Sequence, residues 1–294
     1  DPDTTKDNFG IEPLPDIDFN IRAGNTLVGY ATYNEVKKAV LGDQQGEMDF
    51  DNAMEKVSIK AADLQQTFDK FRQLQTNGDG PLIATVKLEL QKKLDVLKDE
   101  LNQHLSSEYD VKSSNKTIFT EWLKSHQPFH WFIEFYGILK SGGFDVIIGN
   151  PPYVEYSKVK SKYRLSPNIF STEPCGNLYA FICERIQELN RPSGRSGIIV
   201  LLAALGTVRM LPLQAAYRNK SDLIIASHYE ATSHPSVLFV GVEAQLTIIF
   251  NRVKPKGKSP TPKIFTSNYI RTYSIERNLL FERVAFFEIP ITLW

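Results

Sequence analysis

The sequence is poor in cysteine and has no long apolar run. Cys175 and Cys183 are its two cysteines, too few for a disulfide framework or a structural zinc site. No stretch reaches the roughly eighteen apolar residues of a membrane span, and no basic segment followed by an apolar core opens the chain. We therefore expect a cytoplasmic protein with reduced cysteines, no membrane contact and no metal site.

The chain also lacks an excess of charge of either sign. Its 34 basic residues are balanced by 34 acidic residues, which argues against capture of nucleic acid by a broadly basic surface. Any contact with nucleic acid must therefore be local. With 294 residues, of which 42% are hydrophobic, the chain is long enough for one large domain or two smaller ones around a buried core.

The first residues look like the cut edge of a longer chain, so we expect a fragment. Beyond them, alternating apolar residues over Phe19–Arg22 predict a short strand. The strand would end in a turn at Gly24 and Asn25, residue types that tolerate unusual backbone dihedrals. This turn would lie at the carboxyl end of the strand.

A helical segment is predicted from about Tyr33 to Leu123. Glycine, asparagine and proline over residues 77–81 break it into two runs, which indicates a helical hairpin. Apolar residues recur in it at helical spacing, and we expect them to pack against a neighbouring helix. The clearest stripe consists of Leu88, Leu90, Leu94, Leu97, Leu101 and Leu105.

Strand and helix patterns alternate after Phe132. Compact apolar runs predict strands, the first of them a buried strand, and the run between the first two predicts a helix. Such alternation is typical of a mainly parallel α/β sheet. The predicted strands are 144–149, 197–202, 221–227 and 245–250, and the predicted helix is 177–190. The basic, proline-rich residues 252–263 indicate a linker.

The turn after the first of these strands carries the clearest chemistry. Ligands bind at the carboxyl ends of the strands in an open parallel sheet, and Asn-Pro-Pro-Tyr directly follows Gly149. The carboxamide oxygen of Asn150 and the carbonyl oxygen of Pro151 are two acceptors for one amino group, and Pro152 makes the turn rigid. Tyr153 offers a flat ring for a base pulled out of a helix. The alternative is a turn with a purely structural role.

With its lead-in Phe-Asp-Val-Ile-Ile-Gly, this motif resembles the amino-methyltransferases that act on DNA. In that family the Asn-Pro-Pro-Tyr form is associated mainly with adenine N6. The resemblance implies a Rossmann-like sheet and S-adenosylmethionine as methyl donor. It also implies that double-stranded DNA with a flipped adenine is the substrate. Paired acceptors would pyramidalise the adenine amine, which is otherwise a poor nucleophile, so that it attacks a sulfonium methyl without a metal or a covalent enzyme intermediate.

The resemblance extends to the large methylases of restriction-modification (type IIG-like) and phage-defence systems. Gly24-Asn25-Thr26-Leu27 matches a turn that precedes the catalytic strand in that subgroup, and residues 176–181 and 194–199 match the helix and strand that complete the substrate pocket. The implied cofactor-binding residues are Gly24, Asn25 and Asn150. The family's Gly-rich cofactor motif is absent, so we expect that half of the cofactor site upstream of residue 1. A target-recognition region is expected downstream.

A basic loop follows the motif and would contact the phosphates that flank the target base. It contains Lys158, Lys160, Lys162 and Arg164. The alternative is a solvated loop without a ligand.

We expect an α/β fold in which a partial methyltransferase sheet carries a mainly helical insertion. Residues 1–32 and 126–253 would form the core, 33–125 the insertion, and 254–294 a linker and the start of a following region. The function implied is site-specific adenine methylation in a restriction-modification or phage-defence system. Two alternatives stay open. One is an amino methyltransferase for cytosine N4, RNA or protein, and the other is a DNA-binding or assembly module without activity.

Overall fold

The computed structural model describes most of the chain beyond residue 18. The described residues are 19–41, 47–77, 80–166, 169–230, 244–257, 261–270 and 284–293, together with Thr5, Phe239 and Glu282. The predicted core segment 1–32 therefore falls partly outside them. Among the described helices, none is both long enough and apolar enough to cross a bilayer.

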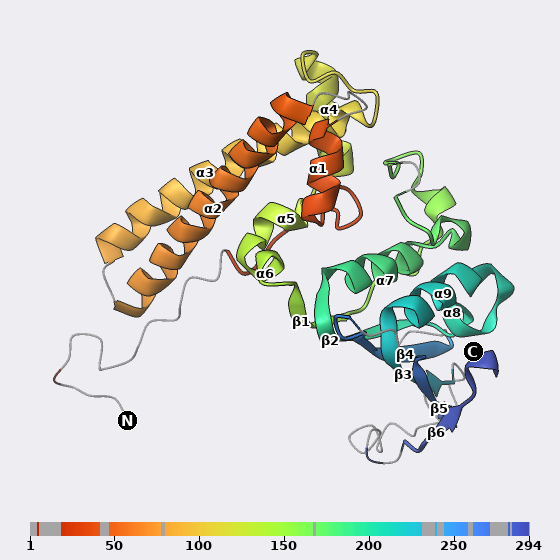
Figure 1. Ribbon diagram of the computed structural model, residues 1–294. Coiled ribbons are helices and arrows are strands. Elements are labelled where there is room, and N and C mark those ends of the chain that lie inside the picture. The colour runs from red at the N-terminus through yellow and green to blue at the C-terminus, as the bar shows by residue number, and fades with distance from the viewer. Residues whose placement is uncertain are drawn as a thin grey trace.

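A long helical hairpin projects from the rest of the molecule, as predicted (Figure 1). Its arms are α2 (Glu47–Asn77) and α3 (Gly80–Ser107), and α1 (Tyr33–Leu41) and α4 (Lys116–His126) lie near its base. The leucine stripe of α3 is buried, except that Leu88 is 64% exposed. Leu88 was wrongly included, because a residue two positions before Leu90 points to the other side of a helix.

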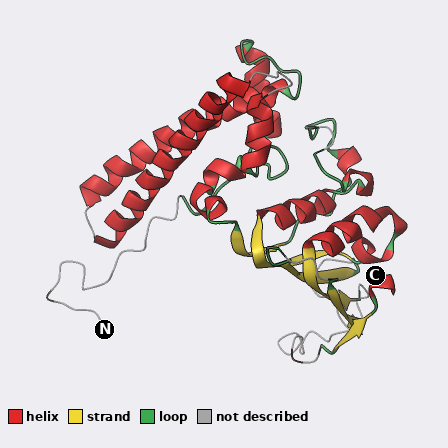
Figure 2. Ribbon diagram, viewed as in Figure 1, coloured by secondary structure: helices red, strands yellow, loops and turns green. Residues whose placement is uncertain are grey.

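The second part of the molecule contains a six-stranded sheet in the order β1-β2-β4-β3-β5-β6. Figure 2 shows this sheet in yellow, apart from the helical hairpin. Two short helices, α5 (Trp131–Glu134) and α6 (Tyr136–Lys140), connect the helical part to the first strand. The α/β class with a helical insertion is confirmed. The strands are β1 (Phe144–Gly149), β2 (Asn190–Leu201), β3 (Ser221–Tyr229), β4 (Leu246–Val253), β5 (Lys263–Ile270) and β6 (Phe286–Ile289).

The sheet is mixed: the prediction of a mainly parallel sheet is confirmed for β1, β2, β3 and β5, which run in one direction, and is wrong for β4 and β6. β1 pairs with β2 and β3 pairs with β5 in parallel. β4 lies antiparallel between β2 and β3, and β6 is antiparallel to β5. The pattern of apolar residues marks a strand but not its direction, and an antiparallel neighbour needs no crossover helix. The sheet also continues past residue 253 into β5 and β6.

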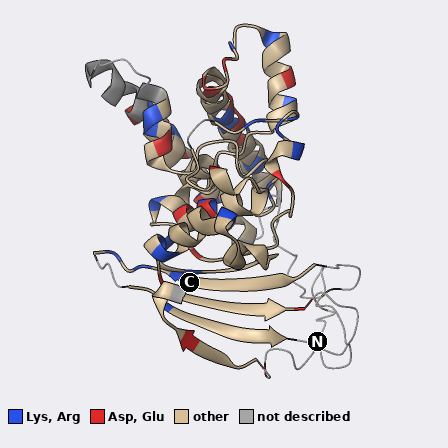
Figure 3. Cartoon of the chain, turned by 90° about the vertical axis from the view of Figure 1, so that its right-hand side faces the viewer, with Lys and Arg blue, Asp and Glu red and all other residues tan. Residues whose placement is uncertain are grey.

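Helices cover one face of the sheet (Figure 3). Within the described residues these are α7 (Leu178–Leu189), α8 (Ala203–Gly206) and α9 (Leu211–Lys220). The core beneath them contains Tyr179, Ile198 and Tyr217. β1 is an edge strand, and Val146 and Ile148 are 58% and 80% exposed. The prediction of a buried strand was therefore wrong for these residues, because burial depends on neighbours that the apolar run itself does not supply.

The predicted strand at Phe19–Arg22 is also absent, since this segment forms turns and bends. Phe19 packs edge-on against Phe68 and Phe71 of α2, with ring centroids 6.1 and 5.2 Å apart. A pattern of four residues is weak evidence for a strand, and here the Phe19 side chain joins the helical core instead.

Candidate active site

The Asn-Pro-Pro-Tyr turn lies where the sequence predicts it, at the carboxyl end of β1. Asn150 is exposed, Pro151 is buried and Pro152 is exposed. β1 runs parallel to β2, so this end of β1 lies beside the end of β2, with Gly149 opposite Ile198. The two acceptors of the turn thus stand at the edge of the sheet where ligands bind in open α/β folds.

The Tyr153 hydroxyl is hydrogen bonded within the turn. It donates to Oδ1 of Asn150 at 2.8 Å, and the carbonyl oxygen of Ile199 lies 3.3 Å away. Burial raises the pKa of Tyr153, so the hydroxyl stays protonated at neutral pH and remains a donor. The ring is partly exposed and meets Tyr179 edge-on, at 6.4 Å between centroids and 81° between planes. Tyr153 therefore fixes which way the Asn150 carboxamide faces.

The start of α7 holds the segment that follows Tyr153. The backbone N–H of Leu178 donates to the Val154 carbonyl at 3.0 Å, and that of Tyr156 donates to the Gly176 carbonyl at 2.9 Å. Asn177 caps α7, where its side chain accepts from the N–H of Tyr179. The structure thus brings the predicted pocket segment 176–181 against the Asn-Pro-Pro-Tyr turn.

An ion pair that the sequence analysis missed lies beside this segment. Nη2 of Arg209 is 2.6 Å from Oε2 of Glu155. Hydrogen bonding to Arg209 is the main reason that the pKa of the Glu155 carboxyl is lowered, and the same interaction raises the pKa of Arg209. The two residues are 54 positions apart, so no local pattern could have paired them.

The turn at Gly24 and Asn25 packs against the segment that precedes α5. The N–H of Asn25 donates to the Gln127 carbonyl at 2.8 Å, and its Oδ1 accepts from the N–H of Leu27 at 3.1 Å. Burial raises the pKa of Tyr163, and the Asn25 side chain partly offsets this rise. A Cβ on Gly24 would come within 2.7 Å of the Phe129 ring, so the close packing here requires glycine.

A cavity of about 230 Å³ lies beside the Asn-Pro-Pro-Tyr turn, and its lining does not include Gly24 or Asn25. Thr26, the neighbour of Asn25, lines it together with Asn150 and Pro151. Arg185 of α7 also lines it and is 1% exposed. Arg185 pairs with Glu35 at 2.6 Å, while its Nε and Nη2 atoms have no hydrogen-bond partner among the described residues. Both nitrogens are buried in the wall of the cavity.

The basic loop after the motif is divided between solvent and the helical part. Lys158, Lys160 and Lys162 are exposed, and Lys160 lies 5.8 Å from the centre of the Tyr156 ring. Arg164 donates to the Tyr109 carbonyl at 3.1 Å. The three lysines are therefore available at the surface, whereas Arg164 is bound to the end of the helical insertion.

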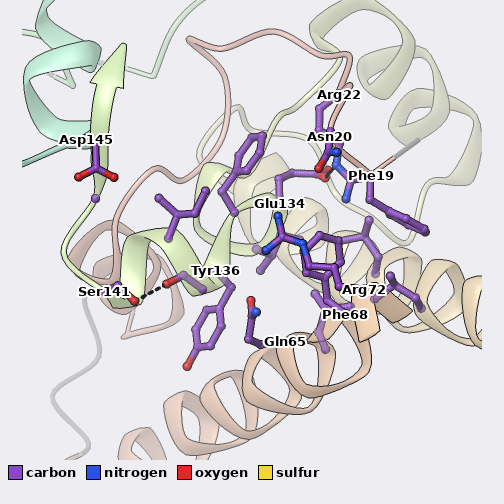
Figure 4. A pocket seen from close by; sticks show the side chains of 18 residues that line it. Phe19, Asn20, Arg22, Gln65, Phe68, Arg72, Glu134, Tyr136, Ser141 and Asp145 are labelled. Carbon is purple, nitrogen blue, oxygen red and sulfur yellow. Dashed lines mark hydrogen bonds and ion pairs between the residues drawn. The ribbon is translucent and has the colours of Figure 1, made fainter. Parts of the chain in front are cut away.

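A larger cavity of about 400 Å³ lies at the other end of β1, between the hairpin and α5–α6 (Figure 4). Asp145, the second residue of β1, lines it, as do Phe68 and Tyr136. The buried Glu134 in its wall pairs with Arg22 at 3.2 Å and with Lys98. None of the residues predicted for catalysis or cofactor binding lines this cavity. Although it is the larger of the two cavities, we therefore do not assign it to that chemistry.

Comparison with known proteins identifies a family. The model of the family described as "Eco57I restriction-modification methylase" matches residues 44–206, more than half of the chain. The chain is 28% identical over 174 residues to a protein of Methanocaldococcus jannaschii described as "Putative type II restriction enzyme and methyltransferase RM.MjaORFECS2P". The match covers 48% of this chain and 15% of that protein.

Among solved structures the chain is similar to parts of longer chains. One is the DrdV–DNA complex, with a TM-score of 0.40 and 15% identity over 49% of this chain and 17% of that chain. Another is a nuclease-deletion mutant of the Type ISP enzyme LlaGI with a DNA substrate mimic. Its TM-score is 0.42, with 10% identity over 54% of this chain and 18% of that chain.

Proposed function

The chain belongs to the Eco57I restriction-modification methylase family, and from this membership we propose that it transfers a methyl group from S-adenosylmethionine to N6 of adenine in double-stranded DNA. One observation carries the proposal. The Asn-Pro-Pro-Tyr turn stands at the carboxyl end of β1 with the Asn150 carboxamide held by Tyr153. The parent protein would act in a restriction-modification or phage-defence system.

Two acceptors of the turn would orient the target amine. The Tyr153 hydroxyl uses one lone pair of Asn150 Oδ1, and the other lone pair is left for one amine hydrogen. The Pro151 carbonyl would accept the second hydrogen. Binding both hydrogens outside the plane of the base favours tetrahedral nitrogen, whose lone pair is then free to attack. Pro152 keeps the two acceptors in place because its ring fixes the backbone.

Tyr153 would hold the flipped base. Its partly exposed ring is supported from the side by Tyr179, an arrangement that leaves a ring face for stacking. Lys158, Lys160 and Lys162 would contact the flanking phosphates. Arg164, already bound to Tyr109, would contribute less to this contact.

The described residues fit one wall of an S-adenosylmethionine site. The cavity of about 230 Å³ is below the roughly 300 Å³ at which ligand pockets begin, so further residues must complete it. Gly24, Asn25 and Asn150 would lie beside the cofactor, since Asn150 lines this cavity and Thr26, the neighbour of Asn25, does so too. The bound cofactor supplies an electrophilic methyl group. We propose that an upstream half of the parent protein forms the rest and that a downstream region selects the DNA site.

The proposed domain division places the core in residues 1–32 and 126–253, the insertion in 33–125, and a linker with the start of a following region in 254–294. The pairing of β5 with β3 favours including at least Lys263–Ile270 with the core sheet.

Replacing Asn150 with alanine in the full-length protein tests the proposal. Methylation of adenine should fall at least a hundredfold, because one of two acceptors is lost, while the circular dichroism spectrum stays unchanged. Asn268→Ala, at an exposed position on β5, is the matched control and should keep wild-type activity. Wild-type methylation by Asn150→Ala would refute the assignment.

A further inference from the structure

The segment after the catalytic tyrosine is held by more than its backbone. Val154 and Tyr156 are hydrogen bonded to the chain at the start of α7. Between them, Glu155 forms an isolated antiparallel bridge with Asn177. Its side chain therefore projects next to the turn that precedes α7.

Arg209 binds Glu155 with two nitrogens. Nη2 lies 2.6 Å from Oε2, and Nη1 lies 3.3 Å from Oε1. Asn177 Nδ2 also donates to Oε1, at 3.4 Å. Gly176, at φ +60°, leaves room for the guanidinium, since a Cβ there would be 2.3 Å from Nη2. A two-point contact of this kind fixes direction as well as distance.

The pair joins the ends of two neighbouring strands. Arg209 belongs to the 3-10 helix Val208–Met210, which follows β2, whereas Glu155 follows the turn after β1. Next to Arg209, Met210 Sδ accepts from the Tyr179 hydroxyl at 3.5 Å, and the Tyr179 ring supports Tyr153. Arg209 is thus linked to the Tyr153 ring through Met210 and Tyr179, and Glu155 is linked to it through the backbone at Val154.

The stability of the fold does not explain this arrangement. The side chains of Arg209 and Glu155 are 50% and 37% exposed, and ion pairs as exposed as this contribute little to folding. A small contribution to folding is compatible with a large effect on catalysis, because small displacements of reacting groups slow reactions strongly.

We infer that the Glu155–Arg209 ion pair is a positioning element, which holds the loop after β2 against the catalytic segment and thereby sets the orientation of Tyr153 and Asn150. This role rests on the proposed methyl transfer. Neither residue touches the reacting atoms in this scheme, so the pair acts through Tyr179 and the backbone at Val154.

Single and double substitutions in the full-length protein test the inference. Glu155→Gln and Arg209→Gln should each lower kcat about tenfold, with KM for DNA changed less than about twofold. Because both substitutions break the same contact, the kcat of the double variant should also be about tenfold below wild type, and not about a hundredfold below it. The matched control is Arg252→Gln, since Arg252 forms a similar two-point pair with Asp222, at the start of β3 and the end of β4. It should keep wild-type kcat.

Hydrogen exchange gives a readout that does not depend on activity. The amides of residues 154–156 and 176–178 should exchange faster in both single variants than in the wild type. In Arg252→Gln their exchange rates should be unchanged. Wild-type kcat with unchanged exchange, additive losses in the double variant, or an equal loss in the control would each overturn the inference. Absence of methylation by the wild-type protein would instead refute the proposed function. The exchange data would then show by themselves whether the ion pair holds the segment after Tyr153 in place.

Discussion

Replacing Tyr153 separates the two roles of its side chain. Phenylalanine keeps the ring that would stack on the base and removes the hydroxyl that donates to Asn150 at 2.8 Å. A neutral hydrogen bond contributes about 0.5–1.5 kcal/mol. If it is needed in the transition state, its loss lowers kcat by roughly two- to twelvefold. Alanine also removes stacking, which adds about 1–3 kcal/mol per base.

The assay uses two oligonucleotide duplexes and the full-length protein: steady-state methylation is measured on a duplex with adenine at the target position, and base flipping is followed by fluorescence of a second duplex with 2-aminopurine there. Tyr153→Phe should flip the base as well as wild type and methylate it several times more slowly. Tyr153→Ala should be impaired in both steps. Wild-type kcat in Tyr153→Phe would refute the role of the hydroxyl, and equal flipping in all three proteins would refute stacking on the ring.

Three further predictions concern the scaffold. His130 is buried and neutral because burial, followed by the charge of Lys98, lowers its pKa to about 3. The stability that it contributes is complete above the unfolded pKa of about 6.5 and is lost as the pH falls below it. From pH 7 to pH 5 the wild type should therefore lose about 2 kcal/mol relative to His130→Gln in urea denaturation, and equal pH dependence would contradict this account. Leu97→Ala should cost about 2–5 kcal/mol, whereas the exposed Leu88→Ala should change stability by less than about 0.5 kcal/mol; similar losses in both would show that the stripe is wrongly placed. Gly24→Ala should cost about 1–3 kcal/mol because its Cβ meets a ring, and an unchanged thermal midpoint would show that the ring moves freely.

Local patterns were sufficient to place the Asn-Pro-Pro-Tyr turn and the hairpin. The apolar run 144–149 ends at Asn150, and a strand followed by a proline-rich turn needs no information from the rest of the chain. The hairpin is similar, since helical spacing and the break near residue 78 are local signals. Both were predicted at nearly the observed positions.

Features that depend on distant residues could not be predicted in this way. β4 reads as a strand, but its antiparallel direction follows from which neighbours it pairs with. The exposure of Ile148 reflects the position of β1 at the sheet edge. Glu155 and Arg209 meet because the segments that follow β1 and β2 begin side by side, at the carboxyl ends of two parallel strands. A charged residue in a loop gives no sequence signal for such a partner.

The most direct test of the central claim is incubation of the full-length protein with radiolabelled S-adenosylmethionine and unmethylated genomic DNA, followed by nucleoside analysis. We predict that the label appears in N6-methyl-2′-deoxyadenosine. Label in N4-methyl-2′-deoxycytidine, RNA or protein would contradict the assigned acceptor. If the protein neither binds the cofactor nor transfers label, the result would contradict methyl transfer itself and favour a DNA-binding or assembly module.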